Sequence, residues 1–263
     1  MLIVQLSDLH VRAPGKLLYR QIDTAGALAA AVSRINAMRP RPQRVVVSGD
    51  LTERGSDEEY AHLRHLLAAL EIPYSLMPGN HDRRAALRAG FPEQGWQGDP
   101  LCCQRVDVDG PDPLCLLLLD TTVPGEDGGT TGAAQLAWLD VACPVATPCL
   151  LFLHHPPITT GIAGLDQIGF ADAARLAQWL PTRPNVRLLA AGHVHRMLTG
   201  VFAGRPIVVA PSTVHQIAFD LSGQENATAW CREPGGMLVH RFDGEGFVTH
   251  YVPIAMAETV PYA

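Results

Sequence analysis

The sequence predicts an α/β fold with a parallel sheet at its centre, and two observations support this prediction. In the amino-terminal third of the chain, short apolar runs alternate with longer segments that place apolar residues at helical spacing. Each apolar run is followed directly by polar residues of the kinds that bind ligands, and open α/β sheets bind ligands at the carboxyl ends of their strands. Strand, helix, strand, helix and strand in this order make two right-handed crossover units with parallel strands.

Two helices are expected between the first three strands. Residues 21–38 are rich in alanine and place their apolar side chains on one stripe, and Pro40 and Pro42 end the segment. Residues 58–70 form the second helix, with Ser56 as its N-terminal cap before an acidic first turn. The strands that these helices connect are expected at residues 2–6, 44–47 and 72–77.

The chain from residue 101 to residue 195 alternates less regularly. Residues 101–109 and 114–120 read as an antiparallel hairpin pair around a Gly-Pro-Asp-Pro turn. The glycine-rich residues 158–170 show little periodicity and are expected to form a loop that borders a pocket. Two more strands are expected at residues 149–153 and 186–191, and two more helices at residues 135–141 and 171–180.

After residue 195 the helical pattern stops. Short strand-like runs broken by Gly, Pro and Asn fill residues 196–263, and we expect an antiparallel tail that forms a second sheet or extends an edge. The sequence contains no internal repeat and no low-complexity linker. We therefore expect one domain over residues 1–263, in which residues 1–195 form the α/β core.

Composition and charge limit the kind of partner. Of 263 residues, 47% are hydrophobic and 17% are charged, as in an ordinary globule with a sizeable core. The net charge of −6 argues against a general nucleic-acid or anionic-membrane binder, but not against small phosphate substrates, because a bound metal inverts the local field. Neither a secretory signal nor an apolar run long enough to span a bilayer is visible, so a cytoplasmic protein is expected.

The cysteines show no paired spacing of the zinc-binding or redox type. We expect small buried hydrophobes in a reducing cytoplasm, and the alternative is a disulfide made by an exposed cysteine, for example between subunits. The cysteines are Cys102, Cys103, Cys115, Cys143, Cys149 and Cys231.

Residue types that bind metals stand at five expected strand ends. In an extended segment, side chains two residues apart project from the same face, which would pair Asp8 with His10 and His193 with His195. Each site alone has an ordinary explanation as a surface residue or a turn, and only the five together indicate a site. The candidate ligands are Asp8, His10, Asp50, Asn80, His154, His193 and His195.

These seven candidates are two aspartates, one amide and four histidines. Seven ligands exceed what one tetrahedral ion needs, and they fit two ions that share a carboxylate. Two-metal sites hold ions roughly 3.5–4 Å apart and stabilise both the entering and the leaving oxygen of a displacement. A structural zinc site would contain more cysteine. Mixed nitrogen and oxygen ligands suit Zn, Mn, Fe or Co, and the sequence does not choose among them.

These motifs together resemble the five-block signature of the calcineurin-like metallophosphoesterases over residues 1–195. The resemblance implies a two-sheet α/β sandwich flanked by helices, with residues 196–263 completing the second sheet. It implies two metal ions, and a role for His81, which contacts the phosphate and helps the leaving group to depart. The matching motifs are Asp8-x-His10, Gly49-Asp50, Gly79-Asn80-His81-Asp82, His154 and Gly192-His193-Val194-His195.

The same resemblance assigns the ligands. It implies that Asp50 bridges the two ions and, with His81, forms the catalytic pair. One ion would be held by Asp8, His10, Asp50 and His195, and the other by Asp50, Asn80, His154 and His193.

Within the family, the chain resembles the bacterial branch that includes cyclic-nucleotide phosphodiesterases and glycerophosphodiesterases. The features that carry this are the first block almost at the amino terminus, the Met-Pro before Gly79, the segment 211–216, and the segment 235–240. Members of this branch act on phosphodiesters of modest size and often form dimers or larger homo-oligomers. We therefore expect a metal-dependent phosphodiesterase for small phosphodiesters.

The resemblance also leads to a hypothesis for the mechanism of hydrolysis. A water or hydroxide bound between the ions attacks phosphorus, while the ions and His81 stabilise the charge on the phosphoryl oxygens. Asp82 and His155 are candidates for orienting His81, His154 or a neighbouring ligand, and His215 is a candidate to reach the pocket from the tail. The alternatives are a phosphomonoesterase, a phosphonate monoesterase, a nuclease, which the acidic composition disfavours, and a scaffold that has lost catalysis.

Overall fold

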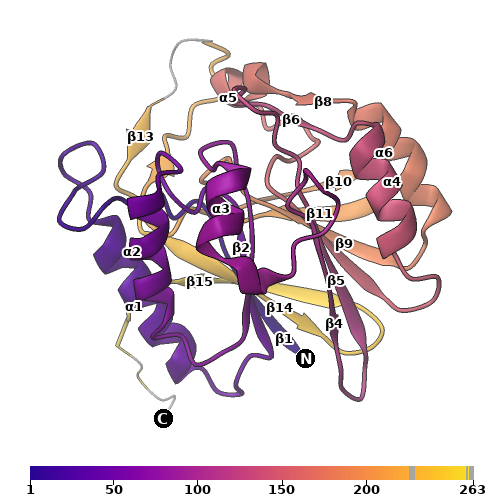
Figure 1. The fold of residues 1–263 in the computed structure, drawn as a ribbon, viewed down its shortest axis with the longest axis horizontal. Helices are drawn as coiled ribbons and strands as arrows, with labels where there is room; N and C mark the ends of the chain where they lie inside the picture. The colour runs from indigo at the N-terminus through magenta and orange to yellow at the C-terminus, as the bar shows by residue number, and fades with distance from the viewer. Residues whose placement is uncertain (225–228, 259, 261–263) are drawn as a thin grey trace.

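The computed structural model describes residues 1–224, 229–258 and 260, and its centre is a pair of sheets packed face to face (Figure 1). Aliphatic side chains from both sheets fill the space between them. Ile3 and Val46 of one sheet pack in the same buried cluster as Leu116 and Phe152 of the other. This two-layer arrangement confirms the expected α/β sandwich.

The first sheet has five strands. They are β1 (Leu2–Leu6), β2 (Arg44–Ser48), β3 (Tyr74–Met77), β14 (Gly236–Phe242) and β15 (Phe247–Pro253). Their order across the sheet is β15-β14-β1-β2-β3. The three amino-terminal strands are parallel, whereas β14 runs antiparallel to β1, and β15 antiparallel to β14.

The second sheet has six strands. They are β4 (Gln104–Val108), β5 (Leu114–Leu119), β7 (Cys149–Leu153), β9 (Val186–Ala191), β10 (Leu198–Phe202) and β11 (Arg205–Val209). Their order is β10-β11-β9-β7-β5-β4. The four inner strands are parallel, and the edge strands β4 and β10 are antiparallel to their neighbours, which confirms the hairpin expected around residues 110–113.

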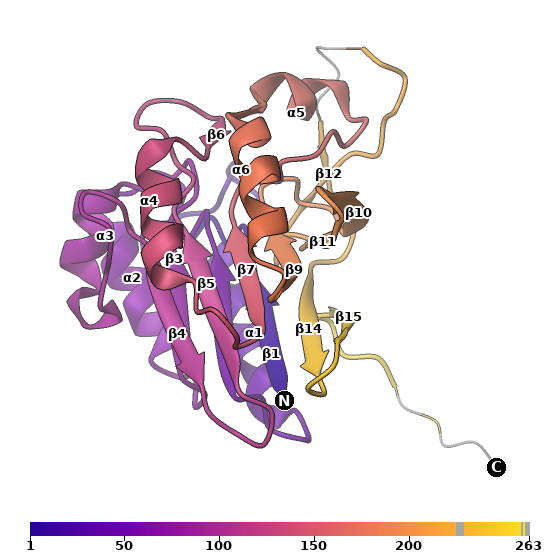
Figure 2. The same ribbon diagram turned by 90° about the vertical axis from the view of Figure 1, so that its right-hand side faces the viewer.

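Helices cover the outer faces of both sheets. Those near the first sheet are α1 (Thr24–Ala37), α2 (Asp57–Leu67) and α3 (Arg84–Gly90). Those near the second sheet are α4 (Ala133–Ala142) and α6 (Ala173–Trp179), whereas α5 (Ala163–Ile168) lies beyond the ends of the strands (Figure 1). Figure 2 shows α4 and α6 lying across the strands of the second sheet. The Ser56 hydroxyl accepts a hydrogen bond from the Glu59 amide, which confirms it as the cap of α2.

Short elements complete the chain. Two 3₁₀ turns cover Pro92–Gln94 and Leu180–Thr182. The two-residue strands β6 (Gly129–Thr130) and β8 (Phe170–Ala171) pair with each other, as do β12 (Gln216–Ile217) and β13 (Trp230–Cys231). Of the described residues, no helix is long and apolar enough to cross a membrane.

The carboxyl-terminal tail extends the edge of each sheet, so the expectation that it completes the second sheet describes only part of its contribution. It supplies β10 and β11 to the second sheet, but β14 and β15 to the first, and β11 is parallel to β9. The sequence pattern could not predict this division, because an alternation of apolar and polar residues indicates a strand but does not indicate which strand it pairs with. Residues 225–228, 259 and 261–263 of the tail lie outside the described residues.

Two local expectations are also corrected. Residues 158–170 contain the short helix α5, and α3 follows β3 where no helix was expected. Both helices have at most seven residues, which is too short for a 3.6-residue period to stand out in the sequence. The cysteines are free, and all except the half-buried Cys231 are buried, as expected.

Candidate metal centre

The candidate ligands lie in loops that leave five parallel strands at the same end of the sandwich. The loops after β1, β2 and β3 come from the first sheet, and those after β7 and β9 come from the second. The backbone amide of His193, in the loop after β9, donates to both carboxylate oxygens of Asp8 at 3.0 and 3.1 Å. The two sheets are therefore joined at the site itself.

The loop backbone coils instead of continuing the strands. Five of the candidate ligands adopt positive φ angles, a region that non-glycine residues rarely occupy. They are Asp8 (52°), His10 (46°), Asp50 (48°), His193 (70°) and His195 (53°). The convergence of Asp8 with His10, and of His193 with His195, therefore arises from left-handed turns and not from the pleat of an extended strand. Strain of this kind concentrates at functional sites.

Backbone hydrogen bonds hold these loops together. The amides of Asp8, His10 and Val11 donate to the carbonyls of Gly49, Asp50 and Leu51 at 2.9–3.1 Å, so the pairing of β1 with β2 continues into the loops. In the second sheet, the Gly192 amide donates to the His154 carbonyl at 2.9 Å.

Glycine allows three of these loops to approach one another closely. A Cβ atom on Gly49 would collide with the His154 ring, and one on Gly79 would collide with Asp50. A Cβ atom on Gly192 would collide with the Ser7 hydroxyl and lie 3.0 Å from an oxygen of Asp8. The ligand side chains can converge because Gly49, Gly79 and Gly192 have no side chains of their own to keep the loops apart.

A first donor cluster consists of Asp8, His10, Asp50 and His195, all buried, with ligand atoms within 4.8 Å of one another. The Nε2 atoms of His10 and His195 are 3.0 Å apart. His195 Nε2 lies 3.4 Å from Asp8 Oδ1, and His10 Nε2 lies 3.5 Å from Asp50 Oδ2.

A second donor cluster lies on the other side of Asp50. Asn80 Oδ1 is 3.2 Å from His154 Nε2 and 3.1 Å from His193 Nδ1. His154 Nε2 is also 3.4 Å from Asp50 Oδ1. Asp50 thus directs one carboxylate oxygen to each cluster, which is the arrangement required of a bridging ligand.

The ring nitrogens show that the clusters fit cations. His10 Nδ1 donates to the Glu53 carboxylate at 2.9 Å, and His154 Nδ1 to the Ser48 carbonyl at 2.8 Å. His195 Nδ1 donates to the His215 carbonyl at 3.2 Å. These oxygens can only accept, so in the neutral ring each Nε2 carries a lone pair directed into the centre. Buried lone pairs facing one another are satisfied by a metal ion, which makes this donor set suitable for one.

The protonation states agree with this donor set at His193, His195 and Asp50. Burial lowers the pKa of His195 well below its usual range, and burial together with the charge of His154 lowers the pKa of His193 to about 4. Burial opposes ionisation of Asp50, but the His154 and His81 imidazoles outweigh it and hold the pKa of this carboxyl well below its usual range. Neutral imidazole and ionised carboxylate are the forms that bind metals.

At His154, burial lowers the pKa, but the charge of Asp50 and a hydrogen bond to it outweigh burial and raise the pKa to about 9. Burial raises the pKa of Asp8. A metal ion would therefore displace protons at these two residues.

His81 lies at the rim of the centre. Its side chain is 35% exposed, and its ring is 4.7 Å from that of His10. Its Nδ1 donates to the Glu53 carbonyl at 2.9 Å, which leaves Nε2 available to a bound molecule. His81 therefore lies beside the first donor cluster with one ring nitrogen available to a bound molecule.

The three supporting candidates have different surroundings. Asp82 accepts hydrogen bonds from the amides of Gly79 and Leu51 and from the Tyr60 hydroxyl, so among the described residues it braces two ligand loops and not a histidine. His155 bonds to Thr121 Oγ1 at 2.9 Å and to the Asp127 carbonyl at 3.1 Å.

His215 reaches the centre from the tail. Its ring centroid lies 4.6 Å from that of His195, and its carbonyl accepts the His195 hydrogen bond. Sequence reasoning missed Glu53, which orients His10. A carboxylate three residues beyond Asp50, in the same loop, was the available signal. The carbonyls of Ser48 and His215 that orient His154 and His195 could not be predicted, because a backbone carbonyl does not depend on the type of residue that carries it.

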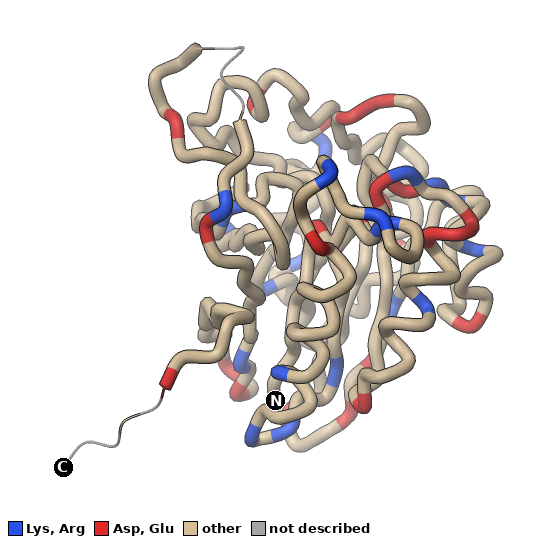
Figure 3. Tube along the Cα trace, turned by 90° about the vertical axis from the view of Figure 1, so that its left-hand side faces the viewer, with Lys and Arg blue, Asp and Glu red and all other residues tan. Residues whose placement is uncertain are grey.

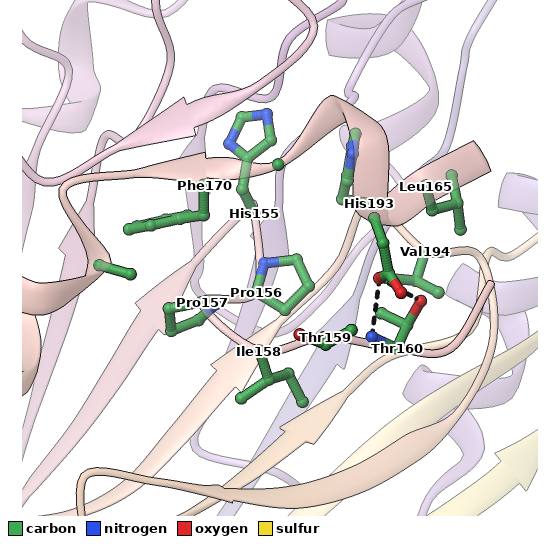
Figure 4. A pocket seen from close by; sticks show the side chains of 13 residues that line it. His155, Pro156, Pro157, Ile158, Thr159, Thr160, Leu165, Phe170, His193 and Val194 are labelled. Atoms are coloured by element: carbon green, nitrogen blue, oxygen red, sulfur yellow. Dashed lines mark hydrogen bonds between the residues drawn. The ribbon is translucent and has the colours of Figure 1, made fainter. Parts of the chain in front are cut away.

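A cavity of about 210 Å³ opens beside the second cluster (Figure 4). His155 and His193 line it together with the apolar side chains of Ile158, Leu165 and Phe170. Residues 158–170 therefore border a pocket, as the sequence predicted.

Sequence comparison finds relatives along most of the chain. The chain is 33% identical to a probable glycerophosphodiester phosphodiesterase, GpdQ, of Arcobacter nitrofigilis, over 95% of this chain and 92% of that protein. It is 36% identical to a probable cyclic nucleotide phosphodiesterase of Rhodopseudomonas palustris, over 84% of this chain and 81% of that protein. The 3′,5′-cyclic adenosine monophosphate phosphodiesterase CpdA of Pseudomonas aeruginosa is 31% identical, with coverages of 83% and 78%.

Structure comparison and a family description agree with these relatives. A dimetal phosphatase from Danio rerio superposes with a TM-score of 0.62 at 17% identity, covering 97% of this chain and 99% of that chain, which supports the fold alone. The sequence description of the calcineurin-like phosphoesterases matches residues 1–197. The chain therefore belongs to the calcineurin-like phosphoesterases.

Proposed function

We propose that this protein is a metal-dependent phosphodiesterase that hydrolyses small phosphodiesters, either cyclic nucleotides or glycerophosphodiesters. The observation that carries the proposal is the position of Asp50, with one carboxylate oxygen directed to each of two donor clusters. Relatives at about one-third identity carry names of both kinds of phosphodiesterase.

The proposal assigns the ligands by cluster. Asp8, His10, Asp50 and His195 would hold one ion, and Asp50, Asn80, His154 and His193 the other. Iron, manganese, zinc and cobalt all suit these nitrogen and oxygen donors. When bound, two such ions lower the pKa of water toward neutrality and offset negative charge on the phosphoryl oxygens.

The chain's own residues then supply position and protons. With Nδ1 anchored on the Glu53 carbonyl, the imidazolium form of His81 directs its Nε2–H toward a phosphoryl or leaving oxygen. It donates that proton to the leaving alkoxide and becomes the neutral ring. Asp82 holds the loops that carry Asp50 and Asn80 in fixed relation. The apolar side chains that line the cavity beside His193 would exclude water from part of the substrate.

The distribution of charge favours a small substrate. Figure 3 shows Lys and Arg positions interspersed with Asp and Glu along the visible trace, and the net charge of −6 disfavours a nucleic-acid chain as the substrate. A phosphomonoesterase or a phosphonate monoesterase of the same fold would use the same metal ligands, and so would a scaffold that kept the metals and lost catalysis. These alternatives differ from the proposal in turnover and not in ligands.

The test compares two chromogenic esters on protein of measured metal content. Turnover of bis(p-nitrophenyl) phosphate well above that of p-nitrophenyl phosphate is the expected result. Faster turnover of the monoester would show a phosphomonoesterase, and no turnover of either ester by fully metallated protein would show a scaffold.

Three further properties belong to the same proposal. We propose that residues 1–263 form one domain, because the tail contributes strands to both sheets. The free cysteines, all buried except Cys231, support a reducing, cytoplasmic location. Assembly as a homodimer or larger homo-oligomer is supported by the family resemblance, and light scattering of the purified protein tests it.

A further inference from the structure

Two aromatic rings from distant parts of the chain stack on each other near the metal centre. The Tyr19 and Trp230 centroids are 5.6 Å apart, and the rings are inclined by only 22°. Tyr19 lies before α1, and Trp230 lies in β13. The contact between these two segments creates an aromatic surface that neither segment could form alone.

This pair is connected to the first donor cluster through one ring. The His215 ring meets Tyr19 edge-on at 5.6 Å and Trp230 edge-on at 6.1 Å. On its other side, His215 lies 4.6 Å from the His195 ring and 5.8 Å from that of His10. A single imidazole therefore separates the aromatic pair from two proposed metal ligands.

The backbone holds Tyr19 in an unfavourable conformation. Leu18 and Ile22 exchange two backbone hydrogen bonds of 2.9 Å, and at the tip of this turn Tyr19 and Arg20 have φ angles of 48° and 62°. Despite this constraint the Tyr19 side chain is 47% exposed, so core packing does not account for its position. Strained, exposed residues beside a site indicate a binding role.

A second contact fixes the turn to the tail. Arg232 lies two residues beyond Trp230, and its guanidinium donates a hydrogen bond to Gln21 Oε1 at 2.6 Å. Burial raises the pKa of the Tyr19 phenol, and the negative charges of Glu53 and Asp50 raise it further. The phenol is therefore neutral, and its contacts with Trp230 and His215 hold the ring in place beside the site.

We propose that Tyr19 and Trp230 form a stacking surface for a planar aromatic ester group of the substrate, either a nucleobase or an aryl group. The inference rests on the proposed diesterase function and narrows its substrate class. Every nucleobase has a π face that aromatic side chains bind, whereas a small aliphatic alcohol such as glycerol gains little from one. The surface therefore selects aromatic diesters over aliphatic ones.

The kinetic test uses Tyr19→Leu and Trp230→Leu with three substrates. For adenosine 3′,5′-cyclic monophosphate and bis(p-nitrophenyl) phosphate, KM is expected to rise about tenfold, within the range of base–aromatic stacking. For glycerophosphoethanolamine, KM is expected to stay unchanged. Tyr19→Phe, which keeps the ring, should keep the wild-type KM for all three. Phe219→Leu is the matched control, because Phe219 is an exposed aromatic residue that is not part of the stacked pair.

A purely structural role for the pair would change KM for all three substrates together, or lower the melting temperature without changing the preference. Either result would overturn the proposal. A change confined to one of the two aromatic substrates would separate nucleobase from aryl recognition and leave the stacking surface in place.

A binding measurement separates failure of this proposal from failure of the diesterase function. Adenosine 5′-monophosphate is expected to bind the wild-type protein about tenfold more tightly than ribose 5-phosphate in calorimetric titration, because only the former carries a base. Trp230→Leu should remove that ratio. The ratio does not depend on hydrolysis. Its absence in the wild type refutes the stacking surface, whereas absent diester turnover with the ratio intact refutes the diesterase function alone.

Discussion

The chemistry of the centre depends on which nitrogen of each histidine faces inward. His10, His154 and His195 all use Nδ1 to donate to an oxygen behind the ring, which leaves Nε2 for a metal. Two of these oxygens are backbone carbonyls, which a substitution does not remove. The third belongs to the side chain of Glu53, so this orienting contact can be tested by mutation.

Glu53→Ala is expected to lower metal affinity by roughly 10- to 100-fold, the usual cost of losing such a contact. The His10 ring would lose the acceptor that fixes it at 2.9 Å. Metal titration of the chelator-treated protein measures the effect, and Glu58→Ala, an exposed glutamate on the next helix, is the control. Equal affinities in the two variants would contradict the role given to Glu53.

His81→Ala is expected to reduce turnover by roughly 10²- to 10⁴-fold while the metal content stays the same, as for loss of a general acid. His81 belongs to neither of the clusters that share Asp50, and because its Nδ1 is bonded to the Glu53 carbonyl, its Nε2 is left for a substrate. Steady-state kinetics and metal analysis on one preparation test this, with the exposed His65→Ala as the control. Full turnover in His81→Ala would show that another group serves the leaving oxygen.

Among the structural elements, the loops after the strands determine the geometry of the site. They approach closely because Gly49, Gly79 and Gly192 have no side chains. Gly192, in the loop after β9 of the second sheet, lies so close to Ser7 of the first sheet that a Cβ atom on it would collide with the Ser7 hydroxyl. Gly246 provides a contrast, since no atom lies within 4 Å of where its Cβ would be.

Gly192→Ala is therefore expected to displace Asp8 and lower metal affinity, whereas Gly246→Ala should change neither affinity nor turnover. A loss of about 1–3 kcal/mol in stability, the usual cost of overpacking, should accompany the first change. Metal titration and denaturant unfolding of both variants measure these effects. Wild-type affinity in Gly192→Ala would show that the loops tolerate separation.

At the scale of the whole molecule, His240 reports on the packing of the two sheets. It is fully buried, and its ring bonds to Gln5 in β1 and Thr249 in β15 and meets Phe152 of the second sheet edge-on. None of these partners carries a charge, and burial lowers the pKa of His240 to about 3. Folding therefore requires the neutral ring.

The lowered pKa of His240 predicts that the free energy of unfolding falls as the pH is lowered. In the unfolded chain the pKa of His240 returns to about 6.5, so the unfolded state gains a proton as pH falls through 6.5 and the folded state does not. The stability contributed by neutral His240 is present above pH 6.5 and is lost progressively toward pH 3. Between pH 7 and pH 5, the wild type should lose about 2 kcal/mol more than His240→Gln. Urea unfolding at both pH values checks this, and equal losses would contradict the burial of a neutral ring.

The sequence predicts the core well because its signals are local. The apolar runs before Asp8, Asp50 and Asn80 mark the strands, and the polar residues after them mark the site. The origin of the convergence was not predictable, because left-handed turns at Asp8 and His193 depend on contacts between distant loops. The division of the tail between sheets and the contact of Tyr19 with Trp230 are long-range in the same sense.

The central claim is that donors from five strand ends hold two metal ions with Asp50 between them. Anomalous diffraction from crystals of the Mn²⁺-loaded protein tests it most directly. We predict two anomalous peaks, one at His10 and His195 and one at Asn80, His154 and His193, with Asp50 in contact with both. Absence of both peaks at full Mn²⁺ loading, or peaks away from these side chains, would contradict the account.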